Sequence, residues 1–305
     1  MPRFNNLYWD AAQKLSRQKL VVICLGIIAV YIFVALLGIL NLLPDYQTRV
    51  ATGYEAPSLG LAKLLGTDIF GRSVLYKILA GTKTAMLIGI LVTSISVPLG
   101  VTLGAVAGYY GGLVDVGIVW LYTVISSVPY ILMVIAISYV IGKGLVAICL
   151  AMGLLGWVGL CRLIRSEVLK NRNLEYVAAA RVIGANDLQI IFRHILPNVV
   201  HLAIISASLQ ILGAIKSEVI LTFLGVGIQD GASWGSMISD ATGELVQGIW
   251  WPLAGVVFTM FLIIYALNVV SDALRDALDP KLRGSTEVVE EDSQLGAKEA
   301  AVQKA

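Results

Sequence analysis

Residues 174–198 read LEYVAAARVIGANDLQIIFRHILPN, a polar and basic segment in a chain that is otherwise mostly apolar. Apolar residues make up 58% of the 305 residues and charged residues 14%, whereas soluble domains carry about 25% charged residues. The chain is therefore expected to lie in a membrane. A charged insert of this length between apolar runs is where such a protein can meet a soluble partner.

Six apolar runs approach or exceed the length of about 20 residues that a helix needs to cross a bilayer. They cover residues 20–43, 84–107, 116–141, 145–161, 199–224 and 250–270. The first run is too long for a signal peptide and no small-residue cleavage site follows it, so we expect an uncleaved span. Pro98 and Pro129 indicate kinks or close packing within their runs. The sequence predicts an all-α polytopic membrane protein with six transmembrane helices.

The basic residues set the orientation through the positive-inside rule. The first 19 residues contain Arg3, Lys14, Arg17 and Lys19, and residues 162–197 contain Arg162, Arg165, Lys170, Arg172, Arg181 and Arg193. Residues 225–249 contain none. Residues 44–83 argue against this orientation, because they hold five basic residues, including Arg72 and Lys77. The majority places both termini and the 162–197 loop in the cytoplasm.

The predicted organisation follows from these spans. A cytoplasmic N-terminus (1–19) precedes a six-span transmembrane domain (20–270), and a cytoplasmic tail (271–305) follows it. Residues 44–83 and 225–249 form external loops. A net charge of +2 is too small to indicate nucleic-acid binding. Because Cys24, Cys149 and Cys161 lie in apolar stretches and the chain has two His, no metal site is expected.

The 174–198 segment itself reads as a helix, a sharp turn and a second helix. Asn173 can cap a helix that starts at Leu174, and three alanines favour it. Gly184 can end this helix with a positive φ. Asn186 or Asp187 can then cap a second helix, Leu188 to Ile195, before Pro197 turns the chain back into the membrane. The pattern fits a docking helix and a solvated connector equally well.

The segment resembles the EAA loop of bacterial ABC-importer permeases: Glu-Ala-Ala, three residues, Gly, nine residues, Ile, one residue and Leu-Pro. Aligned on Gly184, the pattern is matched at Ala179, Ala180, Leu196 and Pro197. Ala178 replaces the Glu and His194 replaces the Ile. This form, YVAAARVIGA…HILPN, is similar to the dipeptide, oligopeptide and nickel importer branch, where the Glu is commonly absent.

Four further blocks are similar to the C-type permease of that branch and occur in matching order. They are LLGTDIFGRSVLYKILAGTKTAM (64–86), AGYYGGLVD (107–115), LTFLGVGIQ…WG (221–235) and DALRDALDPKLRG (272–284). Ser271 stands where the family usually has Gly. The resemblance therefore covers most of the chain.

The resemblance implies a type I ABC-importer fold in a bacterial inner membrane, with alternating access driven by separate ATPases. It implies an ATPase-coupling role for Tyr176, Ala178, Ala179, Ala180, Arg181, Gly184, Leu196 and Pro197. Implied partners are a homologous second permease, two ATPases that bind ATP and Mg²⁺, and an extracytoplasmic solute-binding protein. The chain itself is expected to be no enzyme and to hold no cofactor. The expected cargo is short peptides, with nickel or another small solute as the alternative.

Lys216 and Glu218 interrupt the fifth apolar run, where charges are costly and usually face protein or water. Both are candidates for the translocation path; a helix break near the interface is the alternative. They would also be the coupling pair of an autonomous ion-driven transporter or channel. An intramembrane hydrolase lacks support, because both His lie at the membrane edge. Residues 66–73 nearly match a phosphate loop, but Arg72 replaces its Lys, so we expect a turn shaped by Gly66 and Gly71.

Overall fold

The protein is mainly helical in the part that its structure, a computed structural model, describes: residues 13, 15–142, 144–228 and 231–278. The predicted tail from 279 onward and most of the N-terminus lie outside these residues. The helices are α2 (Lys19–Ile39), the short 3₁₀ turn η1 (Leu61–Lys63), α3 (Val74–Tyr110), α4 (Gly112–Ser126), α5 (Tyr130–Ile141), α6 (Leu145–Asn171), α7 (Glu175–Val182), α8 (Asp187–Gln189), the π-helical segment η2 (Ile190–Ile195), α9 (Leu196–Phe223), α10 (Trp234–Val246) and α11 (Trp251–Leu278). In the described ranges, β pairing is limited to two isolated bridges near the start of α3.

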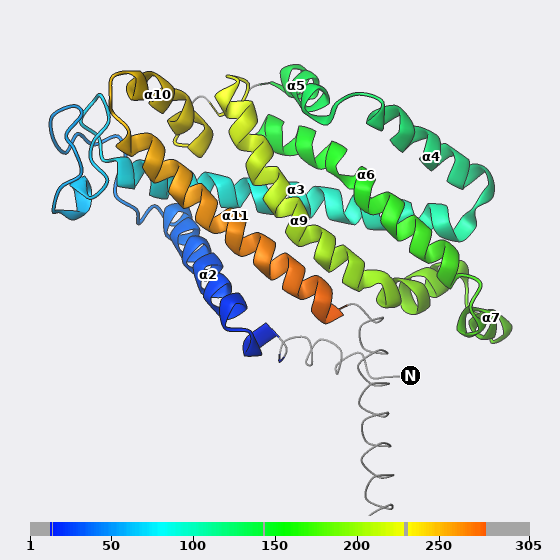
Figure 1. The fold of residues 1–305 in the computed structure, drawn as a ribbon. Helices are drawn as coiled ribbons and strands as arrows, with labels where there is room; N and C mark the ends of the chain where they lie inside the picture. Colours follow the sequence, from blue (N-terminus) through cyan, green and yellow to red (C-terminus); the bar gives the residue numbers. More distant parts are fainter. Residues whose placement is uncertain (1–12, 14, 143, 229–230, 279–305) are drawn as a thin grey trace, which may run out of the picture.

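The long helices run side by side (Figure 1). Residues 40–73 and α10 lie at one end of the bundle, here named the α10 end, and α7 lies at the opposite end, the α7 end. Leu15 packs against Ala277 and Leu278, so the two ends of the described chain lie together, away from α10 (Figure 1). At 1.5 Å per residue, the 37 residues of α3 extend about 55 Å, beyond the hydrocarbon thickness of a bilayer.

Five helices are long and apolar enough to cross a membrane, and the bent pair of α4 and α5 brings the number to six if it counts as one span. The five are α2, α3, α6, the continuous helix Asp187–Phe223 and α11. This confirms the all-helical, multi-span class. The helices also extend beyond the apolar runs, since α3 begins at Val74, α6 continues to Asn171 and α11 to Leu278.

The predicted span over residues 116–141 is broken at Pro129, one of the two prolines that indicated a kink or close packing. α4 and α5 meet at an angle of 92°, with the break at residues 127–129. Pro129 has no amide hydrogen to donate and disfavours a helical backbone at Val128, and with its own ψ at 131° the chain leaves the helical path between α4 and α5. The Ser127 hydroxyl donates to the Val124 carbonyl at 2.7 Å and closes the end of α4. Pro98, by contrast, lies inside the uninterrupted α3.

α3 and α6 form the most extensive helix pair of the fold. Three α3 glycines spaced four residues apart, Gly100, Gly104 and Gly108, lie directly against α6. A Cβ atom added at Gly104 would lie 2.7 Å from the Cys161 carbonyl oxygen, and one at Gly108 would lie 2.8 Å from the Arg165 carbonyl oxygen. Small residues at this spacing let two membrane helices approach closely and gain dispersion contacts along their backbones.

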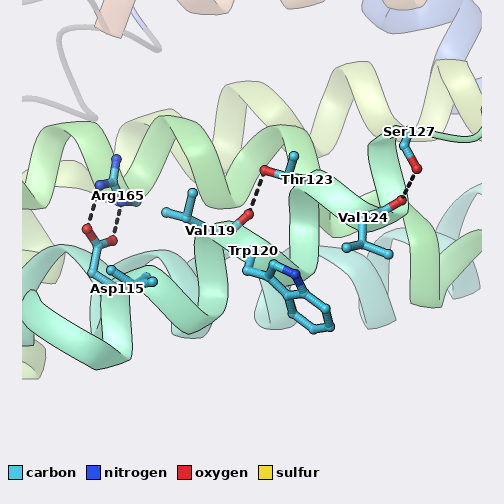
Figure 2. Close-up of a pocket in the computed structure, with 8 residues that line it drawn as sticks. Asp115, Val119, Trp120, Thr123, Val124, Ser127 and Arg165 are labelled. Atoms are coloured by element: carbon cyan, nitrogen blue, oxygen red, sulfur yellow. Dashed lines mark hydrogen bonds and ion pairs between the residues drawn. The ribbon is translucent and has the colours of Figure 1, made fainter.

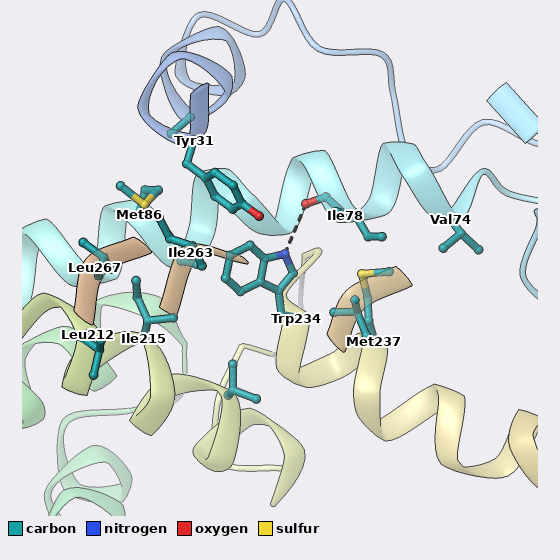
Figure 3. Packing of buried hydrophobic residues seen from close by; sticks show 14 residues of the cluster. Tyr31, Val74, Ile78, Met86, Leu212, Ile215, Trp234, Met237, Ile263 and Leu267 are labelled. Carbon is teal, nitrogen blue, oxygen red and sulfur yellow. Dashed lines mark hydrogen bonds between the residues drawn. The ribbon is translucent and has the colours of Figure 1, made fainter. Parts of the chain in front are cut away.

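A second core holds α10 against α3 at the α10 end. The Trp234 side chain is fully buried and contacts Tyr31 of α2 edge-on, with ring centroids 6.3 Å apart (Figure 3). Its indole Nε1 donates to the Ile78 carbonyl at 3.3 Å. An added Cβ at Gly81 would lie 2.7 Å from the Trp234 ring, so this glycine makes room for it.

We expect Gly104→Ala to destabilise the protein by about 1–3 kcal/mol, because the new methyl group overpacks the backbone contact with α6. The measurement is the apparent melting temperature of the purified protein in detergent. Gly26→Ala in α2 is the matched control, since no atom lies within 4 Å of its added Cβ. Equal melting temperatures for the two variants would contradict the close packing.

Candidate functional site

α7 is a short helix at the α7 end of the bundle (Figure 1). It begins at Glu175 with Leu174 at the N-cap position, where no side chain caps it, so the predicted Asn173 cap does not form. Asn171 instead accepts a hydrogen bond from the Tyr176 hydroxyl at 3.0 Å. Glu175 in the first turn and Arg181 in the last turn both complement the helix dipole.

The turn after α7 agrees with the sequence prediction. Gly184 has φ of +85°, a conformation that favours glycine, and no atom lies within 4 Å of an added Cβ. Asn186 caps the next helix through a capping box, because its side chain accepts from the Gln189 amide at 2.8 Å while Gln189 accepts from the Asn186 amide at 3.1 Å. The angle between α7 and the following helix is therefore fixed by local geometry.

The chain does not turn at Pro197 as predicted, because one continuous helix runs from Asp187 to Phe223. In a regular α-helix the Pro197 ring would clash with the Arg193 carbonyl. The widened segment η2 precedes the proline, and in it the Leu196 amide donates to Ile191, five residues back. The Asn198 side chain donates to the His194 carbonyl at 2.8 Å and so satisfies that acceptor.

The predicted coupling residues divide between the two faces of this region. Val177 and Ala180 are buried against Ile190, Ile191 and other apolar side chains of η2, α3 and α6. Leu196 and Pro197 are half-buried in the long helix. The residues left exposed are Ala178, Ala179, Arg181 and Gly184. One face of α7, made of small residues, is thus exposed, and the other face packs against η2, α3 and α6.

Sequence reasoning missed the apolar residues beside this open face. Val182 and Ile183 are 87% and 82% exposed, and Leu188 and Phe192 are also exposed on the next helix. We define these four residues as the tip patch. Val177 and Ala180 are three residues apart and share the buried face of α7, whereas Val182 and Ile183 do not continue that spacing. This break in the helical pattern is the feature of the sequence that could have predicted their exposure.

α7 and α8 are tied to the end of α3. The Tyr109 hydroxyl donates to the Asp187 carboxylate at 2.6 Å, and the Arg181 guanidinium lies 5.7 Å from the centre of the Tyr109 ring. Arg172 donates to the Gly108 and Tyr109 carbonyls. A displacement of α7 would therefore move the end of α3 as well as the start of α9.

A row of arginines on α6 holds α4. Arg165 makes a double ion pair with Asp115, in which its Nη2 lies 2.6 Å from Oδ2, and a cavity of about 570 Å³ opens beside them along α4 (Figure 2). One turn earlier, Arg162 donates to the Ser126 hydroxyl at 2.8 Å and lies over the Tyr122 ring. Arg162 and Arg165 thus attach α4 to α6.

The two charged residues of the fifth run lie in different environments. Glu218 is fully buried and accepts from the Thr222 hydroxyl at 2.9 Å, and Thr222 in turn accepts from the Ile228 amide. This network fixes the end of α9 to the segment before α10. Lys216 is exposed on the outer side of α9, and no ion pair found in the described ranges includes it. The two do not form a pair.

At the α10 end, carboxylates pair with three of the five basic residues of the 44–83 stretch. Lys63 pairs with Glu55 at 2.8 Å, Arg72 with Asp68 at 2.7 Å and Lys77 with Asp240 at 3.2 Å. The hydrogen bonds from Lys63 and Thr52 lower the pKa of Glu55 to about 2. Local carboxylates thus offset three of the five positive charges that argued against the predicted orientation.

The remaining sequence hypotheses concern metals and phosphates. Gly66 and Gly71 both have φ of +74° and shape the turn before α3, as expected. Arg72, at the position of a phosphate-loop lysine, is held by Asp68. Within the described part of the chain, no group of three or more His, Cys, Asp or Glu side chains could hold a metal ion.

Comparison with known proteins gives one family and consistent relatives. Residues 100–284 match the family described as binding-protein-dependent transport system inner membrane component. The chain is 36% identical to the dipeptide transport system permease protein DppC of Bacillus subtilis, over 90% of this chain and 86% of that protein. It is 35% identical to the oligopeptide permease OppC of Haemophilus influenzae, over 91% and 90% of the two chains.

A further relative is the glutathione transport system permease GsiD of Pectobacterium atrosepticum, 36% identical over 75% of each chain. Among solved structures, the MetNI methionine ABC transporter in inward-facing conformations matches with a TM-score of 0.47 and 17% identity, covering 66% of this chain and 94% of that one. With its helical bundle and the extent of these matches, the chain belongs to the family of inner-membrane components of binding-protein-dependent transport systems.

Proposed function

We propose that this chain is one of two transmembrane permease subunits of an ATP-driven importer for short peptides. The relatives named for dipeptide and oligopeptide transport, each matched over about 90% of this chain, carry the proposal. Its partners are a homologous second permease, two cytoplasmic ATPases and an extracytoplasmic solute-binding protein. The membrane is the bacterial inner membrane, with both termini and the α7 end in the cytoplasm.

In this proposal the tip patch and the open face of α7 are the contact with an ATPase. Two features favour this role over a solvated connector. A connector gains nothing from four exposed large apolar side chains, whereas the centre of a protein interface does. The exposed alanines Ala178 and Ala179 also allow another backbone to approach the helix closely.

The packing of α7 supports a mechanical role in alternating access. Movement of a bound ATPase would displace α7 as a unit, because the Asn186 capping box and the buried Val177 and Ala180 fix it to the long helix Asp187–Phe223. That helix continues to Glu218 and the α10 end. ATP-driven closure at one end of the bundle could therefore re-pack the helices at the other.

Lys216 is the better candidate for the translocation path, and Glu218 for structural support. A lysine ammonium exposed within an apolar helix is costly against lipid, so it is expected to face the second permease or a water-filled path. There it could attract the carboxylate of a peptide. Glu218, fully buried in its hydrogen-bond network, is out of reach of cargo.

The cargo prediction is tested by deleting the gene and measuring uptake. We expect loss of uptake of a radiolabelled dipeptide, restored by the intact gene, with unchanged uptake of radioactive nickel. The reverse pattern would assign the chain to a nickel importer. Dipeptide uptake by vesicles that contain this chain alone, without ATP, would instead identify an autonomous transporter.

We expect Val182→Asp to weaken ATPase association by about tenfold or more, because a charge replaces an apolar side chain worth about 1.5–3 kcal/mol on burial. The measurements are ATPase recovered with the purified permeases and the stimulation of ATP hydrolysis by loaded solute-binding protein. Val246→Asp is the matched control, as Val246 is also the last residue of its helix, is 89% exposed and lies at the α10 end. Equal losses in both variants would refute the ATPase contact.

Lys216→Met is expected to reduce dipeptide uptake by about tenfold while the complex still assembles, since the loss of one charge-assisted hydrogen bond has this magnitude. Lys216→Arg keeps the positive charge and should retain most of the uptake. If the side chain faces lipid, Lys216→Met will instead raise the melting temperature and leave uptake unchanged.

A further inference from the structure

Two cavities adjoin each other at the α10 end of the bundle. The larger has a volume of about 640 Å³ and lies among residues 46–47, the start of α3, the end of α9 and α10. The smaller, of about 280 Å³, contains Asp68 and the buried Glu244. Arg72, Lys77 and Asp240 line both cavities, so these three charged side chains stand between them.

The two cations are held in different ways. Asp68 accepts hydrogen bonds from the Phe70 amide, the Arg72 amide and the Arg72 guanidinium, at 2.7 to 2.9 Å, and is almost fully buried. Arg72 is therefore fixed by a carboxylate that is itself fixed. Lys77 lies 3.8 Å from Asp68 and 3.2 Å from Asp240, so its closest partner belongs to a different element, α10.

The Lys77–Asp240 ion pair can be replaced by contacts with a ligand. The Asp240 side chain is 59% exposed and can turn to solvent, whereas the Lys77 side chain is 12% exposed and needs an anionic partner at this position. Lysine offers three donors, which can be shared between Asp240 and an incoming anion. A ligand that brings its own anion can therefore replace Asp240 at Lys77 without leaving the ammonium unpaired.

The charges facing the larger cavity are complementary to a zwitterion. Its lining contains two cations, Arg72 and Lys77, against the single carboxylate Asp240, because Asp68 faces only the smaller cavity. Ser236, Ser239 and Gln47 add uncharged hydrogen-bonding groups. Its volume lies within the range of about 300–1,000 Å³ that is usual for small-molecule sites.

We propose that the larger cavity binds the two charged ends of a short peptide, its carboxylate at Arg72 and Lys77 and its ammonium at Asp240. The proposal rests on the proposed peptide-import function and adds a binding site at the α10 end. Binding replaces the Lys77–Asp240 pair with two peptide contacts, so a peptide occupies the position that otherwise joins α3 to α10. A receptor surface could also bring an acidic side chain here, and the test separates the two.

The test uses the full importer complex with Ser239→Cys in this chain. Ser239 is exposed and lines the larger cavity, whereas Cys24, Cys149 and Cys161 are buried, so a charged methanethiosulfonate reagent reports on the cavity. The measurement is the labelling rate without and with a dipeptide, its N-acetyl form, which keeps only the carboxylate, or its amide, which keeps only the ammonium.

We expect a dipeptide present at about ten times its Kd to slow labelling by about tenfold, because the free cavity is then only a small fraction of the total. Lys77→Gln, added to Ser239→Cys, should abolish protection by the N-acetyl form and keep protection by the amide. Asp240→Asn should give the reverse. Both substitutions break the same ion pair, so each serves as the structural control for the other.

Equal effects of the two substitutions on both analogues would overturn the proposal, because a purely structural ion pair predicts that result. Protection that requires the solute-binding protein but no peptide would also overturn it and assign the cavity to receptor docking. Dipeptide uptake by the Ser239→Cys complex is measured in parallel. Normal uptake without protection rejects the cavity alone, whereas no uptake by the unmodified complex rejects the peptide-import function as well.

Discussion

The close approach of α3 and α6 at three glycines is the constraint on which the rest of the bundle depends. Because Gly104 and its neighbours carry no side chain, the two backbones lie in contact. Arg165 of α6 can then reach α4, and Arg172 at the C-cap of α6 can reach the carbonyls at the end of α3. Those contacts place Tyr109, which in turn holds α8 through Asp187. The three glycines of α3 therefore determine which partners the charged side chains at the ends of α3 and α6 can reach.

α3 connects the two ends of the molecule directly. Its first turns carry Lys77, which bridges to α10, and its last turn carries Tyr109, which contacts the α7 region. The long helix Asp187–Phe223 runs between the same two ends and is anchored by Asn186 at one and by Glu218 at the other. Because α3 and the long helix are held at both ends, a displacement at the α7 end can be transmitted to the α10 end. This suits the proposed role of coupling ATP hydrolysis on one side of the membrane to import from the other.

The sequence revealed features that depend on local chemistry. Gly184 and Asn186 define a turn through their own backbone preferences, and apolar length defines spans, so both could be predicted. Three features depend on tertiary geometry and could not. The 92° bend at Pro129 and the unbroken helix through Pro197 arise from the same residue type, and only the neighbouring backbone decides between them. The burial of Glu218 and the exposure of Lys216, two residues apart, depend on which face of α9 packs inward.

The widened segment before Pro197 has a consequence for the rotational phase of α9. A regular α-helix advances about 100° per residue, so the additional residue in each turn of η2 sets which way every later side chain points relative to α7. Lys216 and Glu218 point about 200° apart around the helix, so a phase shift of two residues would approximately exchange their surroundings. The π-helical turn therefore has two effects: it accommodates Pro197 within the helix, and it determines that Glu218 is buried while Lys216 is exposed.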